Sequence, residues 1–490
     1  MRDGREHGIH GEKKGNLCGE SHRNAHNSIH TLHSQMRVVQ GECTRIESDK
    51  LSGGKREFVG CFIHLLISMQ NLKINSGKLY FIFGTLFIGL VLLVSFKING
   101  YENTWKFWQI ETLMPPFSDL RLIPGSATTF RRGLDPTIDN PGDPYDRIFN
   151  YPRIWYLLFY TNINQDDVIW LGVVSFALFY IGLISFPGKL DWLGVVIMLL
   201  ITFSPAAMLL YERANVDLLI FFICAMAVLV LDYSLLGVAL IILFGALLKI
   251  FPIFGLSIFL GKDKKLFWRY VFLVVVSFGI YAWLSFSNIQ ASWSLTMRGK
   301  ELSYGLNVIF DRYHDTFSMA LIKLLPPLAI NKLLQVFPYL LGLIVLIAAT
   351  LIGLKHPQPV DSEDSRNLSA FRMGSFIYIG TFLIGNNWDY RLAFLLFTVP
   401  QLADWTLHGK EKHRFWAIVA TALITVSCWH FILAYGFSLR FPDSEIAIII
   451  DEIANWGLFA LLAYFSVVSL PGWVKEMVTN SFQAFHTSSS

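Results

Sequence analysis

Long apolar stretches separated by short polar ones dominate the chain from residue 79 onward. About eleven of them approach the roughly 20 residues that a helix needs to cross a bilayer. They cover residues 79–96, 168–186, 192–211, 216–231, 235–260, 267–286, 333–354, 371–384, 392–405, 415–437 and 456–470. The short stretch 154–160 is an additional candidate. The pattern predicts an all-α polytopic membrane protein with about 11–12 transmembrane helices.

The composition supports this prediction. Of the 490 residues, 53% are hydrophobic and 15% aromatic, which is too apolar for an ordinary soluble protein. The formal net charge is only +4, so binding to nucleic acid has no electrostatic support. The five cysteines form no CxxC pair, and neither a disulfide framework nor a zinc site is indicated.

The chain divides into a polar beginning and an apolar remainder. Residues 1–68 are rich in His and Asn, and we interpret them as a disordered cytoplasmic tail or an upstream extension before Met69. Four histidines within residues 22–33 would suit a metal if helical, but the Asn, Ser and Gly around them are poor helix formers. We expect residues 69–475 to form the transmembrane domain and residues 476–490 a second cytoplasmic tail.

Basic residues cluster between the apolar stretches at 261–269, 353–356 and 408–414. The positive-inside rule places these clusters in the cytoplasm. The loops 97–151, 287–329, 385–391 and 436–445 then face the external side. This arrangement requires either that the stretch 154–160 crosses the membrane or that another segment is re-entrant.

The first external loop carries unusual charge and turn chemistry. Between residues 117 and 155, prolines and glycines predict turns and brief helices on the membrane surface. This stretch holds five aspartates and five arginines: Asp119, Asp135, Asp139, Asp143, Asp146, Arg121, Arg131, Arg132, Arg147 and Arg153. A solvated loop is the plain alternative, but a loop of this length without a function is uncommon in a compact fold.

A short polar interruption separates two apolar spans near residue 212. It contains Glu212, Arg213, Asn215 and Asp217. Ionisable groups near hydrocarbon are costly unless they are paired or lie in a watery cavity. The simplest structural interpretation is an interfacial Glu212–Arg213 pair that caps a tight helical turn.

Lys249 lies deep inside an apolar stretch. The next polar cluster begins at Lys262, and the apolar residues between the two lysines correspond to a helical rise of roughly 17 Å. The side chain of Lys249 is too short to extend over that distance to the polar cluster. Pro252 is expected to kink the helix. Lys249 should therefore face the interior and meet an anion, either a buried carboxylate such as Asp217 or a ligand phosphate.

Two further external loops combine aromatic, amide and charged side chains. The first, residues 296–317, contains Arg298, Tyr304, Asn307, Asp311, Arg312, His314 and Asp315, and the second, residues 385–397, contains Asn386, Asn387, Trp388, Asp389, Tyr390 and Arg391. Such mixtures suit a sugar, which stacks on aromatic rings and hydrogen-bonds to amides and carboxylates. An aromatic belt with an Asp389–Arg391 pair is the alternative for the second loop.

The order of several short motifs resembles a known family. After the first span come "GDPYD", "NYPRIW", "ERANVD", "LLKIFP" and "NNWDYRLAFLL". This order is similar to that of the membrane glycosyltransferases of family 87, which have the GT-C fold and include polyprenyl-phosphate-mannose-dependent mannosyltransferases. The resemblance covers residues 113–260 and 385–396. The chain departs from the family at Arg153, where a second proline is frequent, and at Ala214, where a glycine is frequent.

The resemblance implies a hexosyltransferase. The donor would be a polyprenyl-phosphate sugar and the acceptor a glycan or glycolipid hydroxyl, on the external, periplasmic-type face of a cell membrane, without a cofactor. Asp119 best matches the family's essential acid, with Asp143 and Asp146 as alternates. Candidate substrate-binding residues are Arg153, Arg213, Asn215, Lys249, His314, Asn387, Asp389 and Arg391. The first loop has no DxD pattern, so no metal ligand is expected.

The chemistry required by such a transferase is available in these residues. A carboxylate accepts the proton of the attacking hydroxyl, and Arg or Lys stabilises the leaving phosphate. A transporter or flippase of lipid-linked sugars is the main alternative, although it should show internal repeats and charged groups at mid-membrane. A non-catalytic scaffold is a second alternative, but it would leave Lys249 unexplained.

Overall fold

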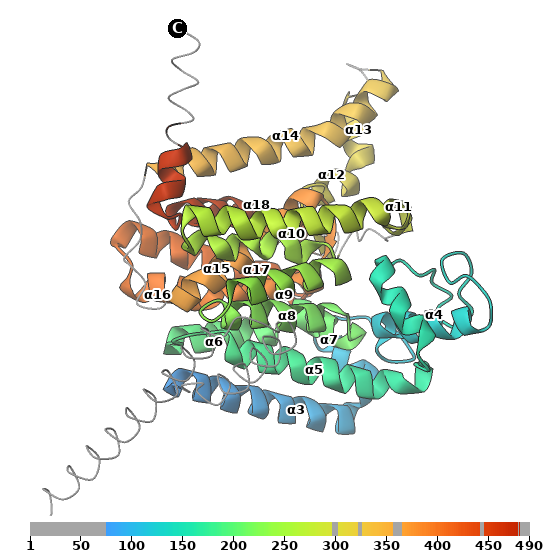
Figure 1. Cartoon of the computed structure of the whole chain (residues 1–490). Coiled ribbons are helices and arrows are strands. Elements are labelled where there is room, and N and C mark those ends of the chain that lie inside the picture. Colours follow the sequence, from blue (N-terminus) through green and yellow to red (C-terminus); the bar gives the residue numbers. More distant parts are fainter. Residues whose placement is uncertain are drawn as a thin grey trace, which may run out of the picture. The chain divides into compact units, whose positions relative to one another are not determined.

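Helices that lie side by side make up most of the described chain in this computed structural model (Figure 1). The structure describes residues 75–295, 302–321, 326–355, 365–441, 445–478 and 480. The described residues belong to one compact unit, Lys73–Ser490. The expected tail, residues 1–68, and Arg298 lie outside the described residues. A helical stretch at residues 472–478 continues past the domain boundary expected at residue 475.

The described chain consists of α-helices interrupted by a few 3₁₀ helices and two short strands. The α-helices are α3 (Ser76–Lys106), α4 (Ser118–Arg131), α5 (Val168–Ser185), α6 (Trp192–Thr202), α7 (Pro205–Arg213), α8 (Asp217–Val230), α9 (Leu235–Leu248), α10 (Lys264–Leu284), α11 (Phe286–Leu295), α12 (Val308–Arg312), α13 (His314–Leu321), α14 (Pro327–Leu354), α15 (Ser365–Ile384), α16 (Val399–His408), α17 (Glu411–Arg440) and α18 (Ile446–Val468). The 3₁₀ helices are η1 (Arg153–Tyr160), η2 (Gln165–Asp167), η3 (Phe251–Gly261) and η4 (Asp389–Thr398), and the strands are β1 (Ser303–Tyr304) and β2 (Asn387–Trp388).

Six described helices are long and apolar enough to cross a membrane: α3, α5, α10, α14, α17 and α18. A seventh span results if α6 and α7, whose axes are bent by 51°, cross as one unit. The elements α8, α9 and η3 are apolar but shorter. The described chain is therefore compatible with a multi-pass membrane protein, and the higher count of 11–12 spans stays a prediction.

The stretch 154–160 does not form a membrane span, which corrects one option left open by the sequence. It lies in η1, an eight-residue 3₁₀ helix. At roughly 2 Å per residue, η1 covers about 16 Å, half of a hydrocarbon core about 30 Å thick. It packs instead against α4 and α9.

The stretch 235–260 is two helices rather than one kinked helix. Ser234 accepts a hydrogen bond from the backbone N–H of Gly237 at 3.0 Å and so begins α9. Lys249 takes an extended conformation with φ −156°, which ends α9. Pro252, which has no N–H to donate, then lies at the start of η3. The break places Lys249 at a helix end inside the bundle.

Aromatic packing holds α5, α8 and η4 together. The ring centre of Phe221 lies 4.5 Å from that of Phe397 and 4.6 Å from that of Phe179. Phe186 contacts Phe397 at 4.7 Å. These large buried rings hold the first turns of α8 against the end of η4, and so position the two elements that carry Asp217 and Arg391.

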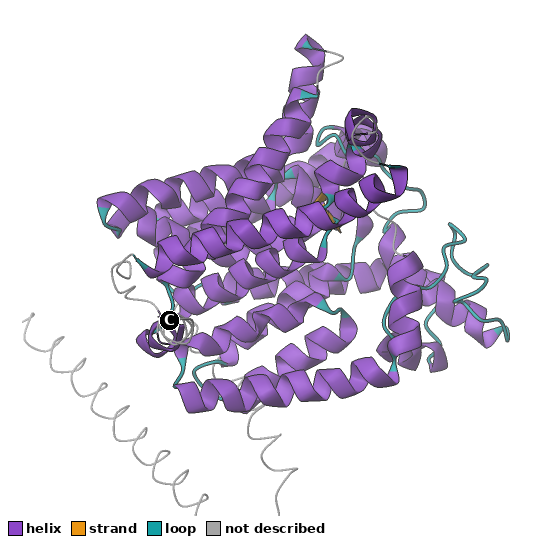
Figure 2. Cartoon of the chain, turned by 90° about the horizontal axis from the view of Figure 1, so that it is seen from above, coloured by secondary structure: helices purple, strands orange, loops and turns teal. Residues whose placement is uncertain are grey.

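Two loops distant in sequence are joined by the short strands β1 and β2, which Figure 2 shows among the helices. The strands are antiparallel, with Tyr304 opposite Asn387. Next to them, Gly305 has φ 134°, and a Cβ there would lie 1.5 Å from the carbonyl oxygen of Gly385. Glycine is therefore required where these chains cross.

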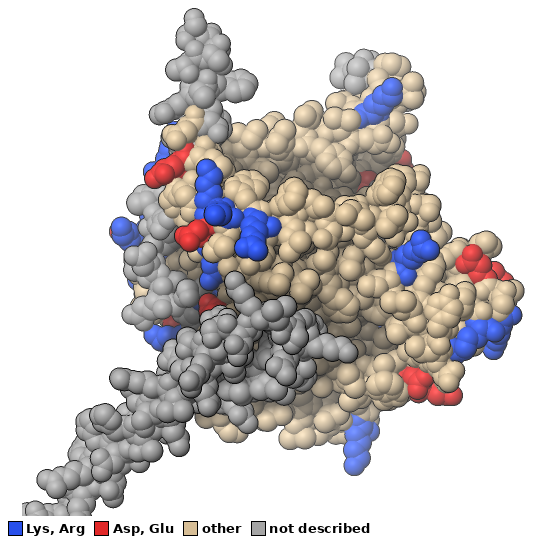
Figure 3. Space-filling view, in the orientation of Figure 1, with Lys and Arg blue, Asp and Glu red and all other residues tan. Residues whose placement is uncertain are grey.

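On the face that Figure 3 shows, charged side chains of the described residues gather mainly toward two opposite ends and leave a broad uncharged area between them. The helix α4 and the loop that follows it lie at one of these ends (Figure 1). This distribution is the one expected for a bundle whose middle contacts hydrocarbon.

Candidate active site

Asp119 lies in the first turn of α4, whereas the sequence predicted only turns and brief helices there. Its Oδ2 accepts a hydrogen bond from Asn215 Nδ2 at 2.6 Å. Its Oδ1 lies 3.4 Å from Arg147 Nη1. The Asp119 side chain remains 23% exposed. The carboxylate is thus held from two directions and still has a face open to an incoming group.

Arg147 is held mainly by Asp143, which is fully buried. The guanidinium donates from Nε to Asp143 Oδ2 at 2.9 Å and from Nη2 to Oδ1 at 3.0 Å. Burial lowers the pKa of Arg147, but hydrogen bonding and charge from Asp143, together with the charge of Asp119, raise this pKa above its ordinary value. Arg147 therefore remains a fixed positive charge beside Asp119.

The loop after α4 is fastened to the helix by buried contacts. Thr129 Oγ1 donates to Asn140 Oδ1 at 2.8 Å, and Asn140 Nδ2 donates to the carbonyl of Arg147 at 2.8 Å. The backbones also approach closely, since a Cβ on Gly142 would lie 2.3 Å from the carbonyl oxygen of Gly125. These contacts make the charged loop a fixed support for Asp119.

Asn215 links Asp119 to the charges inside the bundle. Its Oδ1 accepts hydrogen bonds from Lys249 Nζ at 3.1 Å and from the Asp217 backbone N–H at 3.0 Å. Lys249 Nζ also lies 2.6 Å from Asp217 Oδ1. The buried carboxylate suggested as a partner for Lys249 is therefore the partner observed. A short turn between α7 and α8 positions this arrangement.

Arg391 completes the same charge network from η4. Its Nε lies 3.4 Å from Asp217 Oδ2, and its Nη1 donates to Asn387 Oδ1. Tyr390 lies between the two cations, with its ring centre 5.7 Å from Lys249 Nζ and 6.0 Å from the Arg391 guanidinium. The fully buried Asp217 thus has two cationic partners, which balances the cost of its burial.

Glu212 and Arg213 form the capping pair expected from the sequence. Arg213 Nη1 lies 3.1 Å from Glu212 Oε2. Glu212 Oε1 accepts a hydrogen bond from the backbone N–H of Leu113 at 3.0 Å, which ties the end of α7 to the segment before α4. Arg213 also donates to Ser118 Oγ at 3.4 Å, next to Asp119.

The Asp389–Arg391 pair, the alternative considered for the second loop, is not among the described contacts, and Asp389 instead belongs to a second polar cluster. His430 Nε2 of α17 lies 3.4 Å from Asp389 Oδ2, and His430 Nδ1 lies 3.8 Å from Asp451 Oδ1 of α18. Asp451 also accepts a hydrogen bond from Asn455 Nδ2 at 3.0 Å. The tertiary packing of α17 and α18 therefore determines the partner of Asp389, and sequence proximity does not.

Three other predicted residues lie outside the network of Asp119 among the described contacts. Asp146 is exposed, with φ 51°. Arg153 is exposed at the start of η1. His314 begins α13 and lies 3.4 Å from the exposed Asp315.

The segment after the charged loop covers the end of α9. Trp155 of η1 donates from Nε1 to the carbonyl oxygen of Leu248 at 2.9 Å. The ring centre of Tyr151 lies 5.9 Å from Lys249 Nζ. The loop that carries Asp143 and Arg147 is therefore connected to the same helix end that positions Lys249.

One group of described side chains has the spacing of metal ligands, but it lies elsewhere. Ligand atoms of Asp191, Asp404 and His408 lie within 4.8 Å of one another. Asp404 is already paired with His408 at 3.1 Å and with Gln401 at 3.1 Å. Asp191 precedes α6, at the opposite end of the α6–α7 pair from Arg213.

Sequence reasoning left three contributors out of the proposed site. In the sequence, Arg147 is one loop charge among several, although its spacing of four from Asp143 signals a pair once a turn brings them together. The sequence indicates Asp217 only as a partner of Lys249. It gives one signal for His430, because an ionisable residue inside the apolar stretch 415–437 needs a buried contact.

The fold and the site together define a helical protein, compatible with multi-pass membrane insertion, that has a buried charge network beside a partly exposed carboxylate. Comparisons with models of protein families, with curated proteins and with solved structures gave no match.

Proposed function

We propose that this chain is an integral membrane glycosyltransferase of the GT-C type. It moves a mannose-like hexose from a polyprenyl-phosphate donor to a hydroxyl group of a glycan or glycolipid on the external face. The observation that carries the proposal is the position of the partly exposed Asp119, joined through Asn215 to the buried cation Lys249. This reaction needs both a base and a positive charge that stabilises the leaving phosphate. In this chain the side-chain amide of Asn215 connects the proposed base, Asp119, to the positive charge of Lys249.

The proposed reaction uses these groups in turn. Asp119 accepts the proton of the acceptor hydroxyl as its oxygen attacks the anomeric carbon of the donor sugar. The bond between that carbon and the phosphate oxygen breaks, and its electron pair moves to the phosphate. Lys249 and Arg391 stabilise the added negative charge. A single displacement of this kind inverts the anomeric centre.

Exposure favours Asp119 over the two alternates as the base. Asp143 is fully buried, and both of its oxygens accept hydrogen bonds from Arg147. Asp146 is exposed but takes no part in the described network. In this proposal Asp143 positions Arg147, and only Asp119 combines access with nearby cations.

Sugar transfer in membranes tests the proposal. Membranes from cells that express the chain are supplied with radiolabelled polyprenyl-phosphate sugars, and labelled product is counted. We expect Asp119→Asn to lower transfer at least about 100-fold, as for loss of a general base. Asp139→Asn, an exposed aspartate of the same loop, is the matched control and should transfer normally. Normal transfer by Asp119→Asn at equal expression would show that the base is another residue.

A lipid-linked sugar flippase is the second candidate. The helix break at Lys249 and the bend of 51° between α6 and α7 favour it, because transporters use broken helices at their binding sites. Movement of labelled donor across sealed vesicles, without any new labelled product, would support the flippase. Formation of product would support the transferase.

A further inference from the structure

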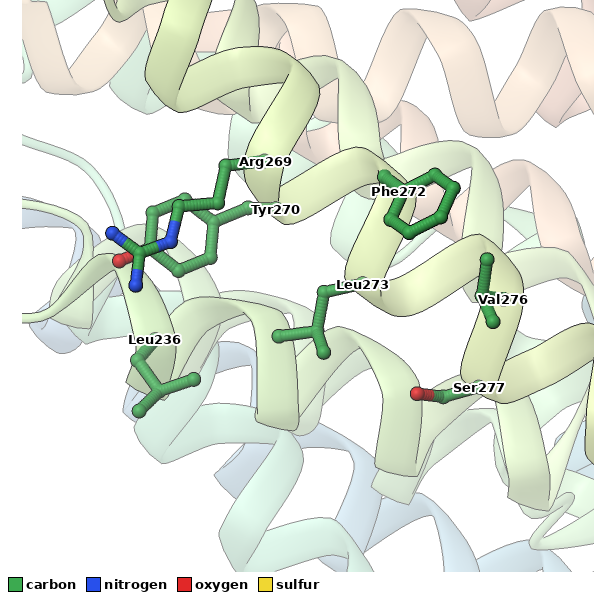
Figure 4. Close-up of a pocket in the computed structure, with 7 residues that line it drawn as sticks. All are labelled: Leu236, Arg269, Tyr270, Phe272, Leu273, Val276 and Ser277. Atoms are coloured by element: carbon green, nitrogen blue, oxygen red, sulfur yellow. The ribbon is translucent and has the colours of Figure 1, made fainter.

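A groove between α9 and α10 is separate from the candidate active site (Figure 4). It has a volume of about 320 Å³ and is lined by Leu236 of α9 and by side chains of α10 between Arg269 and Ser277. Leu236 precedes Lys249 by thirteen residues, roughly 20 Å along a helix axis. The groove therefore lies at the other end of α9 from the network of Asp119.

The two ends of the groove differ in chemistry. Arg269 supplies a positive charge at one end, and its guanidinium lies 5.7 Å from the centre of the Tyr270 ring. Leu236, Phe272, Leu273 and Val276 make most of the remainder apolar, and Ser277 adds one hydroxyl group beside Val276. Val276 is seven residues beyond Arg269, roughly 10 Å along α10, so the apolar part is long enough to receive a stretch of hydrocarbon chain.

The surroundings of Arg269 are those of a membrane interface. Lys264 and Lys265 are exposed in the first turn of α10, and Lys265 shares a helical face with Arg269 because it precedes it by four residues. Trp268 is also exposed, as expected at the level of lipid headgroups. Basic side chains gather at the end of the bundle where α10 begins (Figures 1 and 3).

We propose that this groove binds an anionic phospholipid. The headgroup phosphate pairs with Arg269 and Lys265, and one acyl chain lies along Leu236, Leu273 and Val276. Charge complementarity selects an anionic lipid, because basic residues next to a membrane span attract the negative lipids of the cytoplasmic leaflet. The proposal requires that α10 crosses the membrane, and it does not depend on the transferase reaction.

Native mass spectrometry of the purified full-length chain tests the site. The chain in detergent is titrated with phosphatidylglycerol or with phosphatidylcholine that has the same acyl chains. We expect tighter retention of phosphatidylglycerol, and we expect Arg269→Gln to raise its apparent Kd about fivefold while binding of phosphatidylcholine stays the same. Arg414→Gln is the matched control, because Arg414 is exposed in the first turn of α17 beside an aromatic pair and lies outside this groove.

A second variant tests the apolar half of the groove without changing any charged side chain. Val276→Trp fills the end of the groove away from Arg269, and we expect it to abolish preferential retention of phosphatidylglycerol. Unchanged binding by both Arg269→Gln and Val276→Trp would overturn the proposal, as would equal retention of the two lipids by the unaltered chain. Displacement of phosphatidylglycerol by soluble glycerol phosphate at similar concentration would also overturn it, since the site would then recognise phosphate alone.

Discussion

At the scale of single residues, the amide of Asn215 has the most demanding position in the candidate site. It donates to Asp119 and accepts from both Lys249 and the backbone of Asp217. Few side chains other than an amide can donate in one direction and accept in the other at these distances. Asn215 therefore fixes the spacing between the proposed base and the buried cation.

Replacing Asn215 with alanine should damage stability and sugar transfer together. Loss of the buried hydrogen bonds is expected to lower the free energy of unfolding by about 1–3 kcal/mol, and the released Asp119 carboxylate should transfer label more slowly. Thermal unfolding in detergent and the radiolabel assay measure these effects. Asn99→Ala, at an exposed position of α3, is the control and should change neither. A normal melting temperature for Asn215→Ala would contradict the described bonding.

Individual residues also show what sequence can reveal about a buried site. The apolar surroundings of Lys249 predict that it meets an anion, either a buried carboxylate such as Asp217 or a ligand phosphate, and Asp217 is an anion that it contacts. The alternative of an Asp389–Arg391 pair rests on closeness in sequence, whereas η4 directs the two side chains to different partners. Local spacing identifies which residues need partners, but tertiary packing decides among the available ones.

At the scale of elements, the charge network joins three segments that are separate in sequence. Asp217 begins α8, Lys249 ends α9, and Arg391 lies in the first turns of η4. The pairs Lys249–Asp217 and Arg391–Asp217 therefore hold these segments together at one point. The sequence predicted a kink at Pro252, but the full break at Lys249 depends on contacts from α8 that no local pattern contains.

A double-mutant cycle on Lys249 and Asp217 tests this connection. Asp217→Asn leaves Lys249 and Arg391 without their shared carboxylate and should lower the free energy of unfolding by about 3–5 kcal/mol, whereas Lys249→Met leaves Asp217 paired with Arg391 and should lower it less. The double variant should lose less than the sum of the two, because removing Lys249 takes away part of the positive charge that Asp217→Asn leaves uncompensated. Denaturant unfolding of the four proteins in detergent gives the coupling. Simple additivity of the two losses would show that the pair does not act as a unit.

At the scale of the whole molecule, the distribution of charge is compatible with a bundle whose two ends face water and whose middle faces hydrocarbon. The loop after α4 and the start of α10 both carry clusters of charge, and an uncharged band separates the two ends of the bundle (Figure 3). The general class of the fold was predictable from apolar segments alone. Their division into long spans, a bent pair and shorter helices was not, because segment length does not reveal where proline and buried charge interrupt a helix.

Cysteine labelling tests the proposed orientation. In a chain whose own five cysteines are replaced, Ile138→Cys in the loop and Lys265→Cys at the start of α10 should react with a membrane-impermeant maleimide from opposite sides. Both positions are exposed, and Ile138 is 75% accessible. Labelling of intact cells, compared with labelling of opened cells, measures the side. Reaction of both cysteines from one side would contradict this orientation.

The hydrogen bond from Trp155 to the carbonyl of Leu248 has a mechanical consequence. The indole connects η1 to the last turn of α9, directly before Lys249. The loop that supports Asp119 and the helix break that positions Lys249 therefore form one continuous frame, so a shift of either segment is transmitted to the other. The Lys249 side chain is held separately by Asp217 and Asn215, which keeps the cation in place within that frame.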